Sequence, residues 1–402
     1  MTPAELSRTV LATVRRAVLA EELQVDAVPA KIVVQRPARS GCGDYATNVA
    51  LQLAGPSGRS ALEVAGILAR RLEKEPGIAQ VEIAGPGFLN ITLSPHAFGD
   101  VVRQIRTQRD AYGRGDGLAG EAVTMTADPH LLRAPVVAEA VNLLLRAAGA
   151  PPGPPEPVRV AEPAQASAPS RVPEPVSAAA PAPAPAQPAE LVQPLQPAQP
   201  GTSAEPGAPA TPLGPDATRW ALLRPPAEDV PRLSADLLRQ HESNPLFRVR
   251  YAHARTRALL RNAHDLGVDV ENVAENDAEN GDLLHPAAAA TPHHPAHTPG
   301  PQRSPSAPAP HHPAETELLG LLADFPRVIE TAARRRAPDR VARHLERLAD
   351  AFLRFHDECP PLPMGDEKPS AVHAARVRLA DATGIVLADG LLLLGISAPD
   401  HL

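Results

Sequence analysis

Residues 88–93 alternate two kinds of side chain, and one kind could read an RNA base. Period-two strand geometry separates Leu89, Ile91 and Leu93 from Phe88, Asn90 and Thr92. An aromatic ring can stack on an unpaired base while an amide hydrogen-bonds to the edge of that base. The second set could therefore contact RNA. From these residues alone, however, a strand with a solvated outer face, in which Phe88 packs under a loop, is the favoured interpretation.

A second arrangement follows Asn244, where the spacing predicts a helix. A rotation of about 100° per residue aligns Phe247, Tyr251, Ala254 and Ala258 in one stripe. Arginines border the stripe on both sides, namely Arg248 and Arg255 on one and Arg250, Arg257 and Arg261 on the other. Guanidinium groups bind phosphates and stack on bases, so the stripe suits RNA. A core stripe with arginines extending from its flanks is equally compatible with this helix.

Catalytic and metal-binding patterns are absent from the sequence. There is no P-loop, no Gly-x-Ser-x-Gly elbow and no His-Glu-x-x-His pair. Cys42 and Cys359 lie far apart without metal-ligand spacing, which is typical of a reducing compartment. Six histidines between 285 and 312 stand among Pro and Ala, and a flexible insertion with incidental histidines is favoured over a metal site. We predict no catalytic residue and no metal.

Composition limits the possible partners. The 402 residues carry a net charge of −7, which excludes a bulk basic field, so any nucleic-acid site must be a local patch. No run approaches the roughly 18 apolar residues of a membrane span, and the N-terminus does not have the pattern of a signal peptide. We expect a soluble, cytoplasmic protein that binds neither DNA nor membranes.

Residues 1–115 predict a small α+β domain with a small sheet and helices. Capping boxes at Thr2 with Glu5 and at Ser60 with Glu63 indicate two helices, and Ser94 before a proline indicates a third. Strands are expected over 31–35, 78–83 and 88–93, the last two joined by a Gly-Pro-Gly turn.

The rest of the chain divides by composition. Residues 151–215 predict a long disordered Pro/Ala-rich linker, because they have no periodic apolar face. Residues 216–402 predict an all-α helical bundle with a disordered insertion at 270–312. One apolar stripe in the bundle comprises Val341, Leu345, Leu348, Phe352 and Phe355. Arg340, Arg343, Arg347 and Arg354 share the opposite face beside acidic residues, which favours a solvated, salt-bridged surface.

Several motifs resemble one protein family. Residues 43–50 (GDYATNVA) and 84–90 (AGPGFLN) resemble the N-terminal additional domain of arginyl-tRNA synthetases. Residues 244–255 (NPLFRVRYAHAR) are similar to the start of the α-helical DALR anticodon-binding domain of the same enzymes. The closing residues 394–399 (LGISAP) also look like that family's C-terminus.

The resemblance implies that the catalytic centre between these ends has been lost. Residues 116–150 look like a remnant of the start of the catalytic domain, with its His-x-Gly-His segment deleted or overwritten. No lysine occurs between Lys74 and Lys368, so the family's Lys-rich ATP loop is missing. We therefore expect no ATP site, no cofactor and no aminoacylation by this chain.

The resemblance also implies a tRNA partner, with arginine tRNA as the first candidate. Phe88, Asn90 and Tyr45 would meet the D-loop. Phe247, Arg248, Tyr251, Arg255 and His356 would meet the anticodon side. Arg248 and His356 stand where many synthetases carry tyrosine, and each lost aromatic removes stacking worth roughly 1–3 kcal/mol per base.

Three functions follow from these observations. The first is a non-catalytic tRNA-binding protein whose flexible linker lets two modules adjust their separation. The second is a regulatory or assembly subunit that contacts a protein partner. The third, arginine-tRNA ligase activity, would require a catalytic core within the Pro-rich segment.

Overall fold

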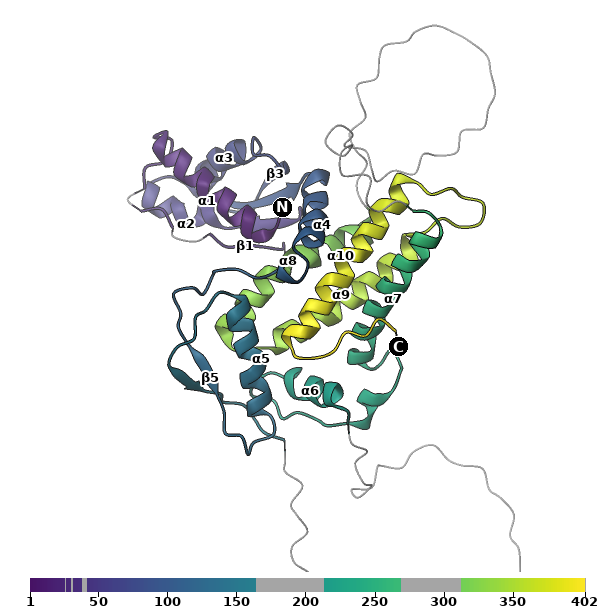
Figure 1. The fold of residues 1–402 in the computed structure, drawn as a ribbon. Helices are drawn as coiled ribbons and strands as arrows, with labels where there is room; N and C mark the ends of the chain where they lie inside the picture. The colour runs from purple at the N-terminus through teal and green to yellow at the C-terminus, as the bar shows by residue number, and fades with distance from the viewer. Residues whose placement is uncertain (26, 30–31, 38–41, 164–212, 269–311, 402) are drawn as a thin grey trace, which may run out of the picture.

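The computed structural model describes residues 1–25, 27–29, 32–37, 42–163, 213–268 and 312–401. They form an N-terminal α/β region and a helical C-terminal domain, as the sequence predicts (Figure 1). Most of the predicted linker and nearly all of the histidine-rich insertion lie outside the described residues.

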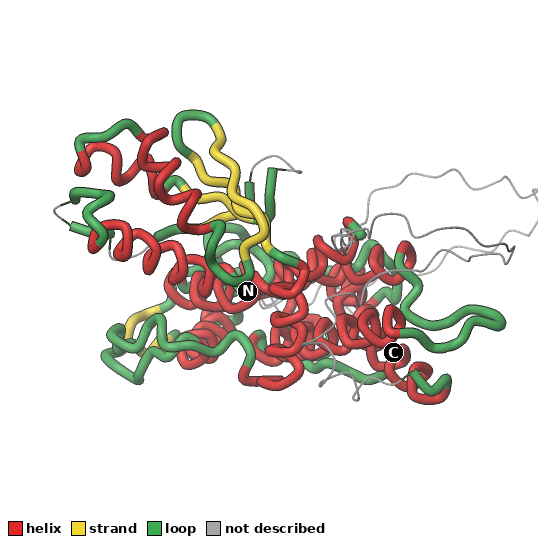
Figure 2. Tube along the Cα trace, turned by 90° about the horizontal axis from the view of Figure 1, so that it is seen from above, coloured by secondary structure: helices red, strands yellow, loops and turns green. Residues whose placement is uncertain are grey.

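The N-terminal region is built on a four-stranded antiparallel sheet in the order β1-β2-β4-β3. The strands are β1 (Val34–Gln35), β2 (Tyr45–Thr47), β3 (Ile78–Ala84) and β4 (Phe88–Leu93). Its helices are α1 (Pro3–Leu19), α2 (Val49–Ser57), α3 (Ala61–Leu72) and α4 (Pro95–Gln108), followed by the 3₁₀ turn η1 (Arg109–Ala111). Seen from above, the strands lie beside helices of the same region, on the side of the molecule away from the C-terminus (Figure 2).

Local signals in this region are confirmed. Both predicted capping boxes form, and Ser94 precedes α4 with proline in its first turn. Leu89, Ile91 and Leu93 are buried while the other three residues of β4 face outward. Alternation along the strand therefore sets which β4 side chains can meet a ligand.

A small βαβ unit follows the N-terminal sheet. Strands β5 (Thr124–Thr126) and β6 (Pro155–Pro157) pair in parallel, and α5 (Ala134–Ala147) connects them. The amide of Asn142 on α5 bonds both the N–H and the carbonyl of Met125, at 2.8 and 2.9 Å. Strand β6 lies inside the segment predicted as linker, since pairing with β5 orders a proline-rich stretch that has no periodicity of its own.

The C-terminal domain is a helical bundle. It contains α6 (Pro215–Leu223), the 3₁₀ turn η2 (Ala235–Leu238), α7 (Pro245–Asp265), α8 (Pro313–Arg335), α9 (Asp339–Glu358) and α10 (Ala371–Leu393). The predicted apolar stripe of α9 is fully buried, which confirms the helical period. Among the described helices, none is both long enough and apolar enough to cross a membrane.

The N-terminal region packs directly on the bundle, with α1 and α4 against α8 and α10 (Figure 1). Tyr112, stacked near Phe325, donates a buried hydrogen bond of 3.0 Å to the carbonyl oxygen of Leu322. Gly113 has φ of +90°, and a Cβ there would lie 2.7 Å from Ile329, so the backbone needs glycine at this contact.

Arginines of the N-terminal region face aspartates of the bundle across this contact. Arg36 pairs with Asp324 at 3.1 Å, and Arg106 pairs with Asp381 at 2.8 Å. This docking differs from the expectation that a linker sets the spacing of two loose modules. Buried packing fixes the separation, whatever the length of the linker.

Candidate nucleic-acid interface

Helix α7 begins where the sequence predicts, and its cap orients the candidate residues. The Oδ1 atom of Asn244 accepts hydrogen bonds from the backbone N–H groups of Leu246 and Phe247, at 3.0 and 3.3 Å. The helix buries a different stripe, which comprises Leu246, Val249, Ala252, His253, Thr256, Leu259 and Ala263. The stripe headed by Phe247 therefore borders solvent, and the core-stripe alternative for it is wrong.

Phe247 and Tyr251 form a stacked pair on this outer side. Their ring centroids are 5.7 Å apart with planes 20° from parallel, and the side chain of Tyr251 is 40% exposed. One helical turn separates the two residues, which brings the rings together. An exposed ring braced by a second ring is a suitable platform for an unpaired base.

Helix α9 contributes to the same site. Arg248 lies 3.5 Å from Asp350, and Arg255 is exposed with no ion pair to another described residue. Burial, and secondarily the charge of Arg255, lowers the pKa of His356. His356 also packs edge-on against Phe352 at 6.2 Å. The structure thus brings the five predicted anticodon-side residues to adjoining helices.

The other arginines of α7 are hydrogen-bonded to the C-terminal tail. Arg250 bonds Asp216 and the Ser397 side chain, and Arg257 bonds Asp400 at 3.0 Å. The ring of His253, whose pKa burial lowers, lies 3.0 Å from the carbonyl oxygen of Pro399. The tail therefore leaves Arg248 and Arg255 as the arginines beside the aromatic pair.

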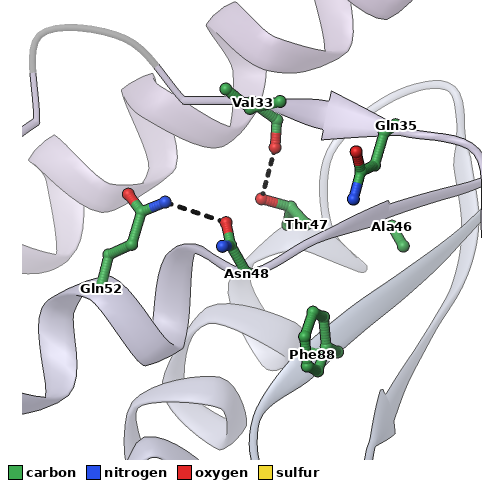
Figure 3. Close-up of a pocket in the computed structure, with 7 residues that line it drawn as sticks. All are labelled: Val33, Gln35, Ala46, Thr47, Asn48, Gln52 and Phe88. Carbon is green, nitrogen blue, oxygen red and sulfur yellow. Dashed lines mark hydrogen bonds between the residues drawn. The ribbon is translucent and has the colours of Figure 1, made fainter.

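A cavity of about 230 Å³ lies beside Phe88 (Figure 3). Phe88 is 38% exposed and forms one wall. Amide side chains form others, with Asn48 and Gln52 on one side and Gln35 on the other (Figure 3). Gln52 Nε2 donates to Asn48 Oδ1 at 2.9 Å, which leaves the Asn48 amide hydrogens for a ligand.

Sequence reasoning missed these three amides. Asn48 stands in a quoted motif, and the spacing of four between Asn48 and Gln52 was a signal that they share a helical edge. Asn90 lies on the same face of β4 as Phe88 and is half-buried between Ala46 and Glu82 on the neighbouring strands.

Tyr45 requires a correction. The prediction that it contacts RNA conflicts with its 2% exposure inside the sheet, where it pairs with Ile91. Burial raises the pKa of its hydroxyl far above the ordinary value, and that oxygen has no hydrogen-bond partner among the described residues. We therefore exclude Tyr45 from the interface, because strand alternation turns it toward the core.

The N-terminus of α5 holds a carboxylate of the same chain. Glu162 accepts hydrogen bonds from the backbone N–H groups of Arg133 and Ala134, both at 2.8 Å. In α/β folds, the helix N-terminus after the first strand is where ligand phosphates bind. Glu162 fills this position here.

Arg133 closes the space beyond Glu162. Its side chain is buried, with 1% exposure, and burial lowers its pKa. The five N–H groups of its guanidinium contact six backbone carbonyl oxygens, with one N–H of Nη1 shared, and the acceptors are those of Ala161, Leu222, Pro225, Pro226, Ala227 and Asp229. The segments after β6 and α6 are thereby drawn over the end of the βαβ unit.

Two known domain families match this chain, one near each end. The family model for the arginyl tRNA synthetase N terminal domain matches residues 4–93, and the model for the DALR anticodon binding domain matches residues 249–402. This chain is related to the arginyl-tRNA synthetases. Phe88 and its cavity lie within the first match, and Tyr251, Arg255 and His356 lie within the second. Phe247 and Arg248 immediately precede the second.

Full-length relatives agree with this assignment. This chain is 28% identical to the arginine-tRNA ligase of Frankia alni over 583 positions, and 29% identical to that of Renibacterium salmoninarum over 581. Both alignments cover all of each chain. Since this chain has 402 residues, at least 181 positions of the first alignment, the difference between 583 and 402, face a gap in it.

A solved structure shares the fold. The arginyl-tRNA synthetase of Thermus thermophilus superposes with a TM-score of 0.54 at 12% identity, covering all of both chains. At this identity the likeness concerns the fold alone.

Proposed function

We propose that this synthetase relative is a non-catalytic tRNA-binding protein, and that arginine tRNA is its first candidate ligand. The observation that carries the proposal is the stacked, exposed pair Phe247 and Tyr251 beside Arg248 and Arg255. The DALR match supports the binding of an anticodon arm by this part of the chain. The cavity beside Phe88 is the proposed site for a base at the tRNA elbow.

The absence of aminoacylation belongs to the same proposal. It is supported by the carboxylate of Glu162 at the N-terminus of α5, where an ATP phosphate would otherwise bind. Arg133 supports it further, since its guanidinium is fully committed to carbonyl oxygens of the same chain. The domain organisation that we propose runs from an N-terminal additional domain, 1–115, through the remnant at 116–150 to the anticodon-binding bundle at 216–402.

The first test is filter binding of the full chain to total tRNA and to an arginine tRNA transcript at two salt concentrations. Salt-sensitive binding to tRNA, without ATP–pyrophosphate exchange, is the expected result. Exchange activity would overturn the non-catalytic role. No tRNA binding at low salt would contradict the proposal and favour a regulatory subunit with a protein partner.

Removal of the aromatic pair is expected to weaken tRNA binding. The double substitution Phe247→Ala and Tyr251→Ala removes stacking worth about 1–3 kcal/mol per base, which corresponds to a roughly 5- to 150-fold rise in Kd. The matched control is Leu392→Ala, which truncates an exposed apolar side chain on α10. Equal affinities for the double variant and the control would show that the pair does not bind RNA.

Phe88→Ala tests the other end of the tRNA. It should raise Kd for full-length tRNA by about 5-fold or more, because one stacking surface is lost. Binding of an isolated anticodon stem-loop should not change, since Phe88 lies in the N-terminal region. Leu19→Ala, at an exposed site on α1, is the control. An equal loss with the stem-loop would mean that Phe88 acts through the fold.

A further inference from the structure

A groove on the helical bundle is lined by arginines. It has a volume of about 470 Å³ and lies between α8 and α9. Four arginines and two carboxylates line it, namely Arg327, Arg340, Arg343, Arg347, Asp339 and Glu346.

The carboxylates of the groove are already engaged. Glu346 pairs with Arg224 of the α6 end at 2.7 Å, which brings in a fifth arginine. Asp339 is buried and lies 3.5 Å from Arg343. Arg340 and Arg347 are exposed, and neither has an ion pair with another described residue. The groove therefore presents a net positive charge to solvent on a chain whose overall charge is negative.

Arg327 connects this groove to the N-terminal region. Its Nη1 atom donates to the carbonyl oxygen of Val34 at 2.7 Å, while Asp324, its nearest carboxylate at 4.0 Å, is closer to Arg36. Val34 belongs to β1, and its neighbours Val33 and Gln35 line the cavity beside Phe88. The α8 wall of the groove is therefore bonded to β1, the strand that also lines the elbow-side cavity.

The α9 wall of the groove lies toward the aromatic pair. Arg347 lies one turn before Asp350 on α9, and Asp350 lies 3.5 Å from Arg248 of the aromatic site. Across the surface, Arg327 of α8 lies on the side of the cavity at Phe88, and Arg347 of α9 lies on the side of Arg248 and the aromatic pair. Because the two domains are docked together, this arrangement is fixed.

We propose that the groove binds phosphate groups of the tRNA backbone between the elbow-side and anticodon-side contacts. The proposal rests on the proposed function, since the RNA that spans the two base sites is the RNA that crosses the groove. Guanidinium groups form bidentate hydrogen bonds with phosphate oxygens, which suits a row of exposed arginines. These contacts position the RNA without reading its sequence.

The test is the salt dependence of tRNA binding by a full-chain double variant, Arg340→Gln with Arg347→Gln. Each phosphate contact adds about 0.7–0.9 to the slope of log K against log salt, so the magnitude of the slope should fall by about 1–2. The matched control is Arg8→Gln with Arg15→Gln. Those residues are also exposed, unpaired among described residues and seven positions apart on one helix, so the change in net charge is equal.

The outcomes separate this inference from the proposed function. A reduced slope in the groove variant, with an unchanged slope in the control, supports the groove. The groove variant could instead keep the wild-type slope while Tyr251→Ala still weakens tRNA binding. That result would overturn the proposal that the groove binds phosphates and would leave tRNA binding itself supported. Equal reductions in both variants would also overturn it, because they would reflect total charge. If the wild-type chain binds no tRNA, the proposed function itself fails.

Discussion

Substitution of Arg133 by methionine is expected to destabilise the fold by at least about 4 kcal/mol. Four of the six carbonyl oxygens would lose their only donor among the described residues, since those of Pro226 and Ala227 keep backbone donors. An unsatisfied buried polar group costs about 1–3 kcal/mol. Effects above about 4 kcal/mol are exceptional and follow from the loss of such buried networks.

Urea denaturation followed by tryptophan fluorescence measures this effect directly. Trp220 is the single tryptophan, it is fully buried, and it lies two residues before Leu222, whose carbonyl oxygen accepts from Arg133. Arg146→Met, at an exposed arginine on the same helix, is the control and should change stability by less than about 0.5 kcal/mol. If Arg133→Met unfolds like the control, the closure over α5 does not contribute to stability.

Asp389→Asn is expected to stabilise the protein at pH 8 and to stabilise it much less at pH 5. Asp389 is 4% exposed, and in the described part of the chain neither of its carboxylate oxygens has a hydrogen-bond partner. Burial raises its pKa to about 7, with Arg114 at 3.9 Å opposing the shift and Asp110 adding to it. The carboxyl group is therefore uncharged in the folded state over a range where the unfolded chain ionises.

The sign of the pH dependence follows from that raised pKa. The folded state binds the proton more tightly, so the stabilisation is complete below the ordinary pKa near 3.8 and is lost as pH rises toward about 7. The loss amounts to about 1–4 kcal/mol, at about 1.4 kcal/mol per unit of pKa shift. Asparagine carries no charge at either pH and removes this loss.

Urea unfolding of both proteins at pH 5 and pH 8 tests the prediction. Asp381→Asn is the contrasting control, because Asp381 pairs with Arg106 at 2.8 Å across the same domain contact and its loss should destabilise the protein. If the difference in unfolding free energy between the wild type and Asp389→Asn is the same at both pH values, Asp389 is ionised in the folded state.

The direct docking of the two domains changes how tRNA binding is understood. Two loosely tethered modules would gain affinity from effective concentration alone. Docked domains instead present the cavity at Phe88 and the pair at Tyr251 at a fixed separation. The length of the Pro-rich segment should then have little influence on tRNA affinity.

Some candidate residues followed from sequence because their geometry is local. The alternation that exposes Phe88 and the turn that joins Phe247 to Tyr251 depend on one strand and one helix. The glutamines and Asn48 around Phe88 come from β1 and α2, and their convergence needs the folded sheet. Sequence reasoning therefore placed the aromatics and missed the amides.

By itself, the sequence determined the capped helices of the N-terminal region, the outward face of β4, the buried stripe of α9 and the relationship to the arginyl-tRNA synthetases. Each of these depends on residues a few positions apart or on a continuous motif. Only the tertiary structure decided that Tyr45 is buried, that the tail takes Arg250 and Arg257, and that Glu162 fills the N-terminus of α5. Those outcomes depend on contacts between distant segments, which no local pattern encodes.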